Sequence, residues 1–177
     1  MTQAPIEIVE YSPLWAELFK HERELLVHTL ARWLVGAPEH IGSTAVPGLA
    51  AKPVIDIMAP VSSLQASVPA IEAASRAGYV FYPYKAEVMH WFCKPSPSHR
   101  THHLHLVPLD SQPWHDRLAL RDALRTSERL RTEYQGLKRA LAQAHREDRE
   151  AYTDGKSAFI AQFLEAADPS LVAGAAG

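Results

Sequence analysis

The sequence predicts an α+β fold, in which a mixed sheet is flanked by helices and the C-terminal portion is entirely helical. Segments with strand patterning gather before residue 108, whereas the apolar repeats after Ser111 have helical spacing. Strands in one half of a chain and helices in the other are typical of α+β proteins. With 177 residues, 47% of them hydrophobic, the chain is long enough to bury one sizeable core.

A short strand and a long helix are expected first. Residues 6–10 alternate between apolar and polar side chains, which predicts a strand. Ser12 and Pro13 then supply an N-cap and a proline for the first helical turn. Apolar residues recur behind them at helical spacing and predict a helix that ends near Gly36: Trp15, Leu18, Phe19, Leu26, Leu30 and Trp33.

The centre of the chain predicts most of the sheet. Residues 54–59 are β-branched and apolar except for Asp56, which indicates a buried central strand. Four further elements are expected in this part of the chain: a helix over 64–77, and strands over 79–84, 88–94 and 103–107.

Three helices are expected after Ser111. One starts at Pro113, a second follows Ser127, and a third contains Phe159 and Phe163 before the stop at 168–169. No repeat or long linker divides the chain, so 1–169 is predicted to be a single domain and 170–177 a flexible tail.

Composition excludes several classes of function. The formal net charge of −2 provides no general basic field, so neither nucleic acid nor a membrane surface is an expected partner. No apolar run approaches the roughly 20 residues that span a bilayer. Residues 1–10 lack the pattern of a signal peptide, and Cys93 is the single cysteine, expected to be a packing residue. The expected location is therefore the cytoplasm.

The segment 39–59, E-H-I-G-S-T-A-V-P-G-L-A-A-K-P-V-I-D-I-M-A, contains the most information about function. Gly42 would let the backbone approach a phosphate closely, and Ser43 and Thr44 would donate hydrogen bonds to it. Asp56 is an isolated acid in an apolar strand, where a charge is costly unless it is paired or bound to a metal. Taken alone, these residues also fit a turn glycine and a structurally paired aspartate.

This segment resembles the signature of the polymerase-β-like nucleotidyltransferases, which is a Gly-Ser, a spacer of about this length and then acids on a strand. More specifically, H-I-G-S-T-A-V-P-G-L-A-A-K-P-V-I-D-I is similar to the GrpB family, a branch of that superfamily. The resemblance extends over about 6–167 and implies a nucleotidyltransferase-like mixed sheet. It includes five further motifs: Ser12-Pro13-x-Trp15, R-T-H-H-L-H-L-V at 100–107, R-D-A-L-R at 121–125, Tyr134-x-x-Leu137-Lys138, and Tyr152-x-x-x-Lys156-x-x-Phe159-Ile160.

The resemblance implies roles for individual residues of the segment. Gly42 and Ser43 match the pair that contacts phosphate, and Asp56 matches the first metal-binding carboxylate. Catalytic members of the superfamily have a second acid two residues later, where this chain has Met58. Two-metal transfer needs ligands that hold both the attacking and the leaving oxygens, so Met58 argues against ordinary nucleotidyl transfer.

The second candidate group is the histidine strand. His103 and His105 would share one face of a strand, with Leu104 and Leu106 toward the core. An H-x-H pair can converge on one metal ion. With the resemblance, this strand takes the place of the strand that carries the third carboxylate, so both histidines would join Asp56 as catalytic residues around Mg, Mn or Zn, or around a phosphate. The alternative is a pair of histidines bonded to backbone carbonyls.

Basic residues are candidates for an anion-binding wall. Arg121 and Arg125 are four residues apart and share one helical face. Arginine binds phosphates in two-pronged fashion, although Arg125 would equally pair with Asp122 or Glu128. With the resemblance, the wall comprises Arg100, Arg121, Arg125, Lys138 and Lys156.

Five other residues have two interpretations each. Tyr134 would offer its ring to a base or would pack in the core, and Lys52 would reach a phosphate or cover the end of a strand. His40 and His90 would reach the cleft or be structural, and the structural role is expected. Glu87 would replace the missing acid or be a solvated loop charge, and the loop charge is expected.

Two functions follow. The first is a GrpB-like enzyme that binds a nucleotide or another phosphorylated small molecule with a divalent metal and transfers a nucleotidyl or phosphoryl group. The second is a catalytically degenerate binding or accessory module that senses a nucleotide or assists the folding of a partner protein. The residues identify no particular protein partner.

Overall fold

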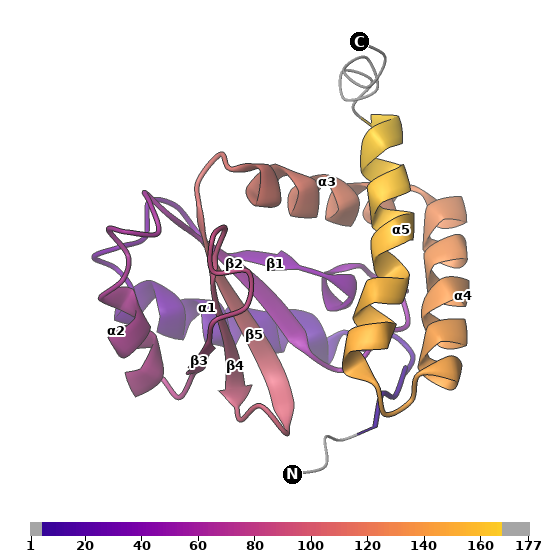
Figure 1. The fold of residues 1–177 in the computed structure, drawn as a ribbon, viewed down its shortest axis with the longest axis horizontal. Helices are drawn as coiled ribbons and strands as arrows, with labels where there is room; N and C mark the ends of the chain where they lie inside the picture. The colour runs from indigo at the N-terminus through magenta and orange to yellow at the C-terminus, as the bar shows by residue number, and fades with distance from the viewer. Residues whose placement is uncertain (1–4, 168–177) are drawn as a thin grey trace.

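The computed structural model describes residues 5–167, which form a five-stranded mixed sheet with helices around it (Figure 1). The strand order is β1-β2-β5-β4-β3, in which β2 and β5 are parallel and the other neighbours are antiparallel. The strands are β1 (Glu39–Ile41), β2 (Ile55–Val61), β3 (Val80–Tyr82), β4 (His90–Pro95) and β5 (Arg100–Pro108). The predicted α+β class is confirmed.

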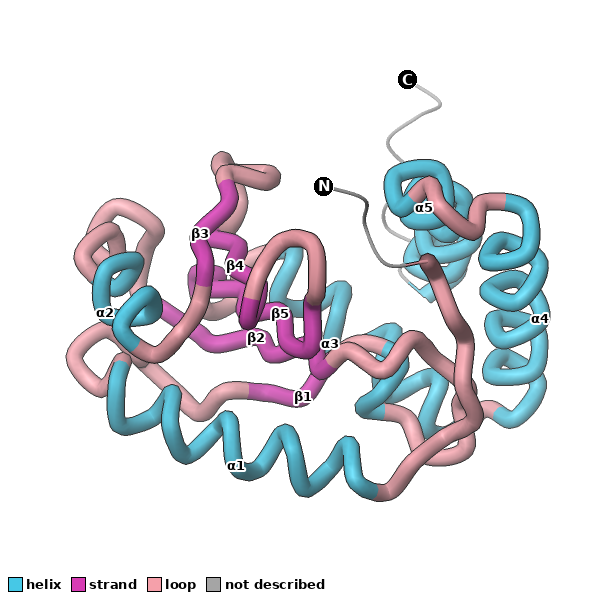
Figure 2. Tube along the Cα trace, turned by 90° about the horizontal axis from the view of Figure 1, so that it is seen from below, coloured by secondary structure: helices cyan, strands magenta, loops and turns pink. Residues whose placement is uncertain are grey.

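The helices divide into two groups. One face of the sheet packs on α1 and α2, through a core in which Leu26 and Leu30 meet Ile57 and Leu104. The other three helices follow the sheet in sequence, and α4 and α5 lie side by side apart from the strands (Figure 2). The helices are α1 (Leu14–Thr29), α2 (Ala70–Arg76), α3 (Gln112–Thr126), α4 (Glu128–Ala144) and α5 (Arg149–Ala167), with a short 3-10 turn, η1 (Ser43–Ala45).

The register of β2 and β5 positions the candidate residues. Asp56 is aligned with His103 and Met58 with His105, so these four side chains share one face of the sheet. The residues between them, including Ile57 and Leu104, point into the core beneath α1. The alternation predicted for both strands is confirmed.

Three elements differ from the sequence-based expectation. Residues 6–10 form no strand but one bridge, Val9 to Ala51, and the expected helix over 64–77 is helical only over α2. Pro69 precedes α2, and proline fits the start of a helix but not its interior. The helix α1 ends at Thr29 rather than near Gly36, because the chain turns toward the sheet and Leu34 bridges to Val61.

The C-terminal helices agree closely with the prediction. The hydroxyl of Ser127 accepts a hydrogen bond from the backbone N–H of Leu130 at 3.2 Å and caps α4. Stacked rings of Tyr134 and Phe159, 5.1 Å apart, join α4 to α5. The expected stop at Asp168–Pro169 and the expected tail lie outside the described residues. Within 5–167, the helices are too short or too polar to cross a lipid bilayer.

Candidate functional site

Asp56 and the two histidines of β5 meet on the open face of the sheet. His103 Nδ1 lies 2.8 Å from Asp56 Oδ1, and His105 Nε2 lies 3.7 Å from the same oxygen. One ligand atom from each of the three side chains falls within 4.8 Å of the others. His103 Nδ1 and His105 Nε2 thus face a carboxylate and not the backbone carbonyls that the alternative interpretation expected.

The charge state of this group follows from its burial and hydrogen bonds. Burial alone would raise the pKa of Asp56, but the hydrogen bond from His103 and the nearby ring of His105 outweigh it, and the pKa is well below its usual value. Burial lowers the pKa of His105 to about 3, an effect that Arg117 reinforces and Asp56 opposes. Asp56 is therefore an anion and His105 a neutral ring at physiological pH.

Gly42 lies directly against the carboxylate. A Cβ at this position would be 2.6 Å from Asp56 Oδ2. Its backbone has φ 71° and ψ −171°, a conformation that is essentially restricted to glycine. The Gly-Ser turn that the sequence suggested thus approaches Asp56 more closely than any other residue type would permit.

Arg117 of α3 reaches the same group from above the sheet. Its Nη1 donates to His105 Nδ1 at 2.6 Å, and its Nη2 lies 3.6 Å from Met89 Sδ. The negative charge of Asp56 favours the charged guanidinium, although burial is the larger effect and lowers its pKa. Arginine has no acceptor atoms, so His105 Nδ1 must be the acceptor of this bond.

The donor atoms fit a divalent cation in type and arrangement. His103 Nε2 and His105 Nε2 are buried and have no hydrogen-bond partner within the described part of the chain. Buried polar atoms without partners are rare in native structures and point to a ligand or ion. Imidazole nitrogens beside one carboxylate are suitable ligands for zinc or manganese. Met58, fully buried among Ile41, Met89 and Trp91, adds no oxygen ligand.

Two lysines near Asp56 both lie over the ring of Tyr152. Lys52 Nζ is 4.8 Å from the ring centroid of Tyr152, and Lys156 Nζ is 4.5 Å from it. Burial, with the charge of Lys156, lowers the pKa of Lys52 to about 8, whereas Asp56 opposes the shift. Burial likewise lowers the pKa of Lys156 against the effect of Asp56.

Lys138 and Tyr134 are buried beneath this pair. Lys138 is 2% exposed, donates to the carbonyl of Ala50 at 2.6 Å, and lies over the Tyr134 ring. Burial and the nearby Lys156 lower its pKa to about 7. Because the Tyr134 ring stacks on Phe159, it presents no open face to a base, as the core interpretation predicted.

Arg121 and Arg125 are directed toward the β1 edge rather than toward Asp56. Arg121 bonds Glu39 and Asp122, each at 2.7 Å, and Arg125 donates to the carbonyl of Ala45 at 3.0 Å. Arg125 also pairs with Asp122 at 3.5 Å, which is the plainer of its two predicted roles. Both arginines line a shallow pocket of about 280 Å³ between α1 and α3.

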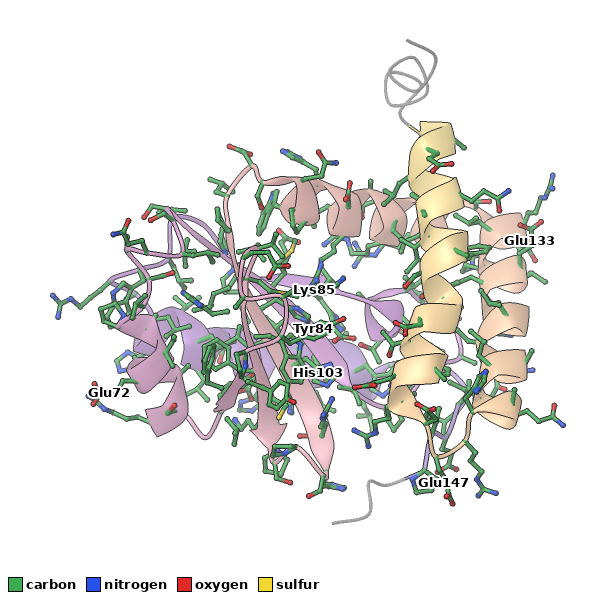
Figure 3. All side chains as sticks on the ribbon, in the orientation of Figure 1. Glu72, Tyr84, Lys85, His103, Glu133 and Glu147 are labelled. Atoms are coloured by element: carbon green, nitrogen blue, oxygen red, sulfur yellow. The ribbon has the colours of Figure 1, made fainter. Side chains whose placement is uncertain are left out.

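An aromatic surface borders His103 on the other side. The ring centroids of Trp91 and His103 are 5.0 Å apart, and the guanidinium carbon of Arg100 lies 5.2 Å from the Trp91 centroid. The ring centroids of Tyr82 and Tyr84 lie 6.2 and 6.1 Å from that of Trp91, and the two tyrosines are 54% and 41% exposed. Figure 3 shows Tyr84 and His103 near each other on the face of the sheet, whereas Glu133 and Glu147 lie at the periphery.

The remaining candidates have structural contacts. Thr44 Oγ1 bonds His40 Nε2 at 3.0 Å and donates to the Val54 carbonyl, which fixes η1 to the strand. His90 Nε2 donates to the carbonyl of Leu64 at 3.0 Å. Cys93 is fully buried in the apolar cluster around Met58, as expected for a packing residue.

The sequence did not indicate Arg117, Trp91, Tyr82 or Tyr84 as site residues. Arg117 is one helical turn before Arg121, so the sequence shows the regular spacing of the arginines on α3. It does not show which residues of α3 face the sheet. The aromatic residues had the ordinary pattern of a hairpin.

Comparison with known proteins identifies the family. The family model described as GrpB protein matches residues 5–166. The chain is 37% identical over 166 residues to a UPF0157 protein of Pseudomonas aeruginosa, and 31% identical over 170 residues to the glutamate-rich protein GrpB of Alkalihalophilus pseudofirmus. These matches cover 90% and 93% of this chain, and 66% and 97% of the relatives. A UPF0157 protein of Bacillus subtilis is longer, and the match covers 45% of it at 32% identity.

Solved structures support the same assignment. The crystal structure of the conserved protein GrpB from Enterococcus faecalis has a TM-score of 0.80 at 35% identity, over 88% of this chain and 93% of that one. The GLD-2/RNP-8 complex and a cytoplasmic RNA terminal U-transferase have TM-scores of 0.55 and 0.53 at 11% and 13% identity. They cover 75% and 76% of this chain, and 55% and 43% of their own.

The distant structures establish a nucleotidyltransferase-like fold, and the relatives and the family model establish the closer kinship. The Asp56–His103 pair lies on the two central strands of that fold. This chain belongs to the GrpB family.

Proposed function

We propose that the face of the sheet around Asp56 binds a nucleotide or another phosphorylated small molecule together with a divalent metal ion. One observation carries the proposal: an ionised carboxylate, a buried and a half-buried imidazole and the Gly42 backbone converge within a few ångströms, on a fold that nucleotidyltransferases share. Neither packing nor stability requires such a convergence, because each group must be desolvated.

The positive charges around Asp56 support a phosphorylated ligand. Lys52 and Lys156 lie within electrostatic reach of this carboxylate, which opposes the lowering of both pKa values by burial, and of the Lys52 pKa by the charge of Lys156, without cancelling it. A phosphate between them would supply the missing negative charge. Arg149 also acts on Lys52 electrostatically, and it lines a pocket of about 560 Å³ at the α4–α5 connection.

The organic part of the ligand would lie on the aromatic surface of Tyr82, Tyr84 and Trp91. Trp91 is buried against His103, and Tyr82 and Tyr84, which contact Trp91, are exposed, whereas the Tyr134 ring is covered. A flat base stacks favourably on tyrosine or tryptophan, typically with about 1 kcal/mol beyond the area that it buries. A nucleotide would thus place its base near Tyr84 and its phosphates near Lys52 and Asp56.

Asp56 and the histidine strand would hold the metal ion, which when bound would neutralise phosphate charge and polarise a phosphoryl oxygen. Gly42 and Ser43 would contribute backbone and hydroxyl donors, and Lys52 and Lys156 would balance charge that develops on a transferred group. Nucleotidyl or phosphoryl transfer is the enzymatic form of this proposal. Met58 favours the second form, a binding module without transfer, because it removes one expected carboxylate ligand.

Thermal denaturation with a ligand panel tests the proposal. A ligand that binds only the native state raises the melting temperature by mass action, so no reaction has to be assumed. The panel comprises nucleoside mono-, di- and triphosphates and inorganic pyrophosphate, each with and without Mg²⁺, Mn²⁺ or Zn²⁺. The proposal expects a metal-dependent increase for the wild type that is lost in Asp56→Asn.

Asp110→Asn is the matched control, because Asp110 is an exposed carboxylate whose near neighbour is also a histidine, His115, at 3.9 Å. It should respond to ligands as the wild type does. Equal increases in Asp56→Asn and the wild type would contradict the proposed site.

A further inference from the structure

The two histidines of β5 are held by partners of opposite kind. His103 Nδ1 faces the carboxylate of Asp56 at 2.8 Å, whereas His105 Nδ1 faces the guanidinium of Arg117 at 2.6 Å. An ionised carboxylate only accepts hydrogen bonds and a guanidinium only donates them. The same nitrogen of the ring must therefore be a donor in His103 and an acceptor in His105.

This difference fixes the other nitrogen of each ring. A neutral imidazole has one N–H and one lone pair, so His103 has its lone pair on Nε2 and His105 has its proton there. Both Nε2 atoms are buried without a partner within hydrogen-bond distance in the described residues, and Asp56 Oδ1 lies 3.7 Å from His105 Nε2. A metal ligand must offer a lone pair, and a ligating histidine commonly donates its second N–H to a carboxylate, as His103 does.

We propose that the site is divided by Arg117: of the two imidazoles only His103 can ligate a divalent cation, through Nε2, while Asp56 supports its ring from the Nδ1 side. His105 is instead a hydrogen-bond donor for an anionic oxygen of the ligand. Arg117 is then a positioning residue, since it acts through the His105 ring. The inference refines the metal site of the proposed function, but it concerns the ligand-free protein and can be tested without nucleotide or turnover.

The surroundings of Arg117 support a fixed position. Its second terminal nitrogen lies 3.6 Å from Met89 Sδ, and His105 Nδ1 lies 3.4 Å from the same sulfur. The positive guanidinium is also placed where it makes binding of a second cation beside His105 unfavourable. Met58, the residue aligned with His105, offers only a thioether to such an ion.

The direct test is the protonation pattern of the two rings by NMR. Histidine-selective ¹⁵N labelling and long-range ¹⁵N–¹H correlation distinguish a protonated nitrogen from one with a lone pair, and His103→Gln and His105→Gln assign the signals. The wild type should show the proton on Nδ1 of His103 and on Nε2 of His105. In Arg117→Met, His105 should lose its single form while His103 keeps it. The exposed Arg129→Met should change neither ring.

A proton on Nδ1 of His105 in the wild type would overturn the division, as would an unchanged His105 signal in Arg117→Met. The wild-type spectrum alone decides the first point, even if the variant does not fold. It does so whether or not a phosphorylated ligand is ever found.

Zinc titration tests the cation part, with the metal alone as the probe. Only the zinc binding that is lost in Asp56→Asn is compared. His103→Gln should lower the affinity of this binding about tenfold or more, the usual loss when a ligand or its close support is removed. His105→Gln should leave the affinity unchanged. In an Arg117→Met background, His105→Gln should now lower the affinity, because the freed Nε2 becomes a ligand. Equal losses from His103→Gln and His105→Gln in otherwise wild-type protein, or no Asp56-dependent zinc binding, would overturn the assignment.

Discussion

His103 Nδ1 donates to Asp56 Oδ1 at 2.8 Å across the parallel pair of β2 and β5, where the two residues are aligned in register. The alignment means that the contact is set by the backbones of two central strands rather than by a loop. Side chains on such rigid elements keep their geometry with little entropic cost when a ligand binds. The same pair therefore fixes the ionised state of Asp56 and the orientation of the ring beside it.

Replacement of Gly42 by alanine should disrupt the site. The positive φ is strained for alanine by about 1–3 kcal/mol, and the new methyl group would lie 2.6 Å from Asp56 Oδ2. The expected result is lower stability in urea denaturation and loss of ligand-induced stabilisation. Gly48→Ala is the matched control, because its φ of 77° imposes strain of the same kind, with no other heavy atom within 4 Å of the new methyl group. If both variants retained ligand response, the approach of Gly42 to the carboxylate would have no role in binding.

Lys138 should make stability depend on pH. Burial lowers its pKa from 10.5 in the unfolded chain to about 7 in the folded protein. Between these values the unfolded chain binds a proton that the native state does not, so the free energy of unfolding should rise with pH across that range. Urea denaturation at pH 7 and 9 should show that Lys138→Met reduces this rise by about 1–2 kcal/mol.

The control for this experiment is Lys20→Met, since Lys20 is exposed on α1. Its pH dependence should equal that of the wild type. A wild-type slope in Lys138→Met would show that Lys138 is charged in the native state at neutral pH. The loss of the Ala50 hydrogen bond lowers stability at every pH and does not affect the comparison of slopes.

Met58→Asp distinguishes the two forms of the proposed function. The new carboxylate would stand beside His105 and opposite Glu39, near the position where the superfamily has its second acid. If the chain is a degenerate transferase, this variant should gain metal affinity in calorimetric titration with Mn²⁺, at a stability cost of about 1–3 kcal/mol for a buried polar group. Met58→Leu controls for packing. A folded Met58→Asp protein without added affinity would contradict a degenerate two-metal site.

Tyr84→Leu should distinguish the contribution of the base to affinity from that of the phosphates. Without the ring, stacking is lost, and affinity for a nucleoside triphosphate should fall roughly fivefold or more, the equivalent of about 1 kcal/mol. Binding of inorganic pyrophosphate should not change, because the phosphate contacts are elsewhere. Tyr11→Leu is the control, a tyrosine that packs on Trp15 beside α1. Equal losses for both ligands would show that Tyr84 acts on the fold rather than on a base.

The meeting of Asp56 with the histidine pair was predictable from the sequence because it depends on strand alternation. A period of two places Asp56 on one face of β2 and both histidines on one face of β5, and two adjacent buried strands then bring them together. The isolated acid in an apolar strand and the H-x-H spacing were sufficient signals. The resemblance to nucleotidyltransferases supplied the expectation that the two strands are neighbours, which the parallel pairing confirms.

The helices were less predictable, because the side of a helix that meets the sheet depends on packing. Arg121 and Arg125 have the spacing of an anion wall, yet the docking of Trp114 and Leu118 on the Met58 cluster directs Arg117 toward His105. Glu39 on the edge strand then captures Arg121. Such contacts between residues far apart in sequence leave no local pattern.

A phosphorylated ligand that binds at Gly42 and Asp56 should shift the backbone amide signals of the surrounding residues, which NMR mapping measures residue by residue. Nucleoside triphosphates with Mg²⁺ are titrated into ¹⁵N-labelled protein, and the shifted amides are assigned. The largest shifts are expected at 42–44 and 52–56, with smaller ones at 82–84, and all of them should be lost in Asp56→Asn. Saturable shifts confined to the β1-edge pocket around Arg121, or no shifts at millimolar ligand, would contradict binding at Gly42 and Asp56.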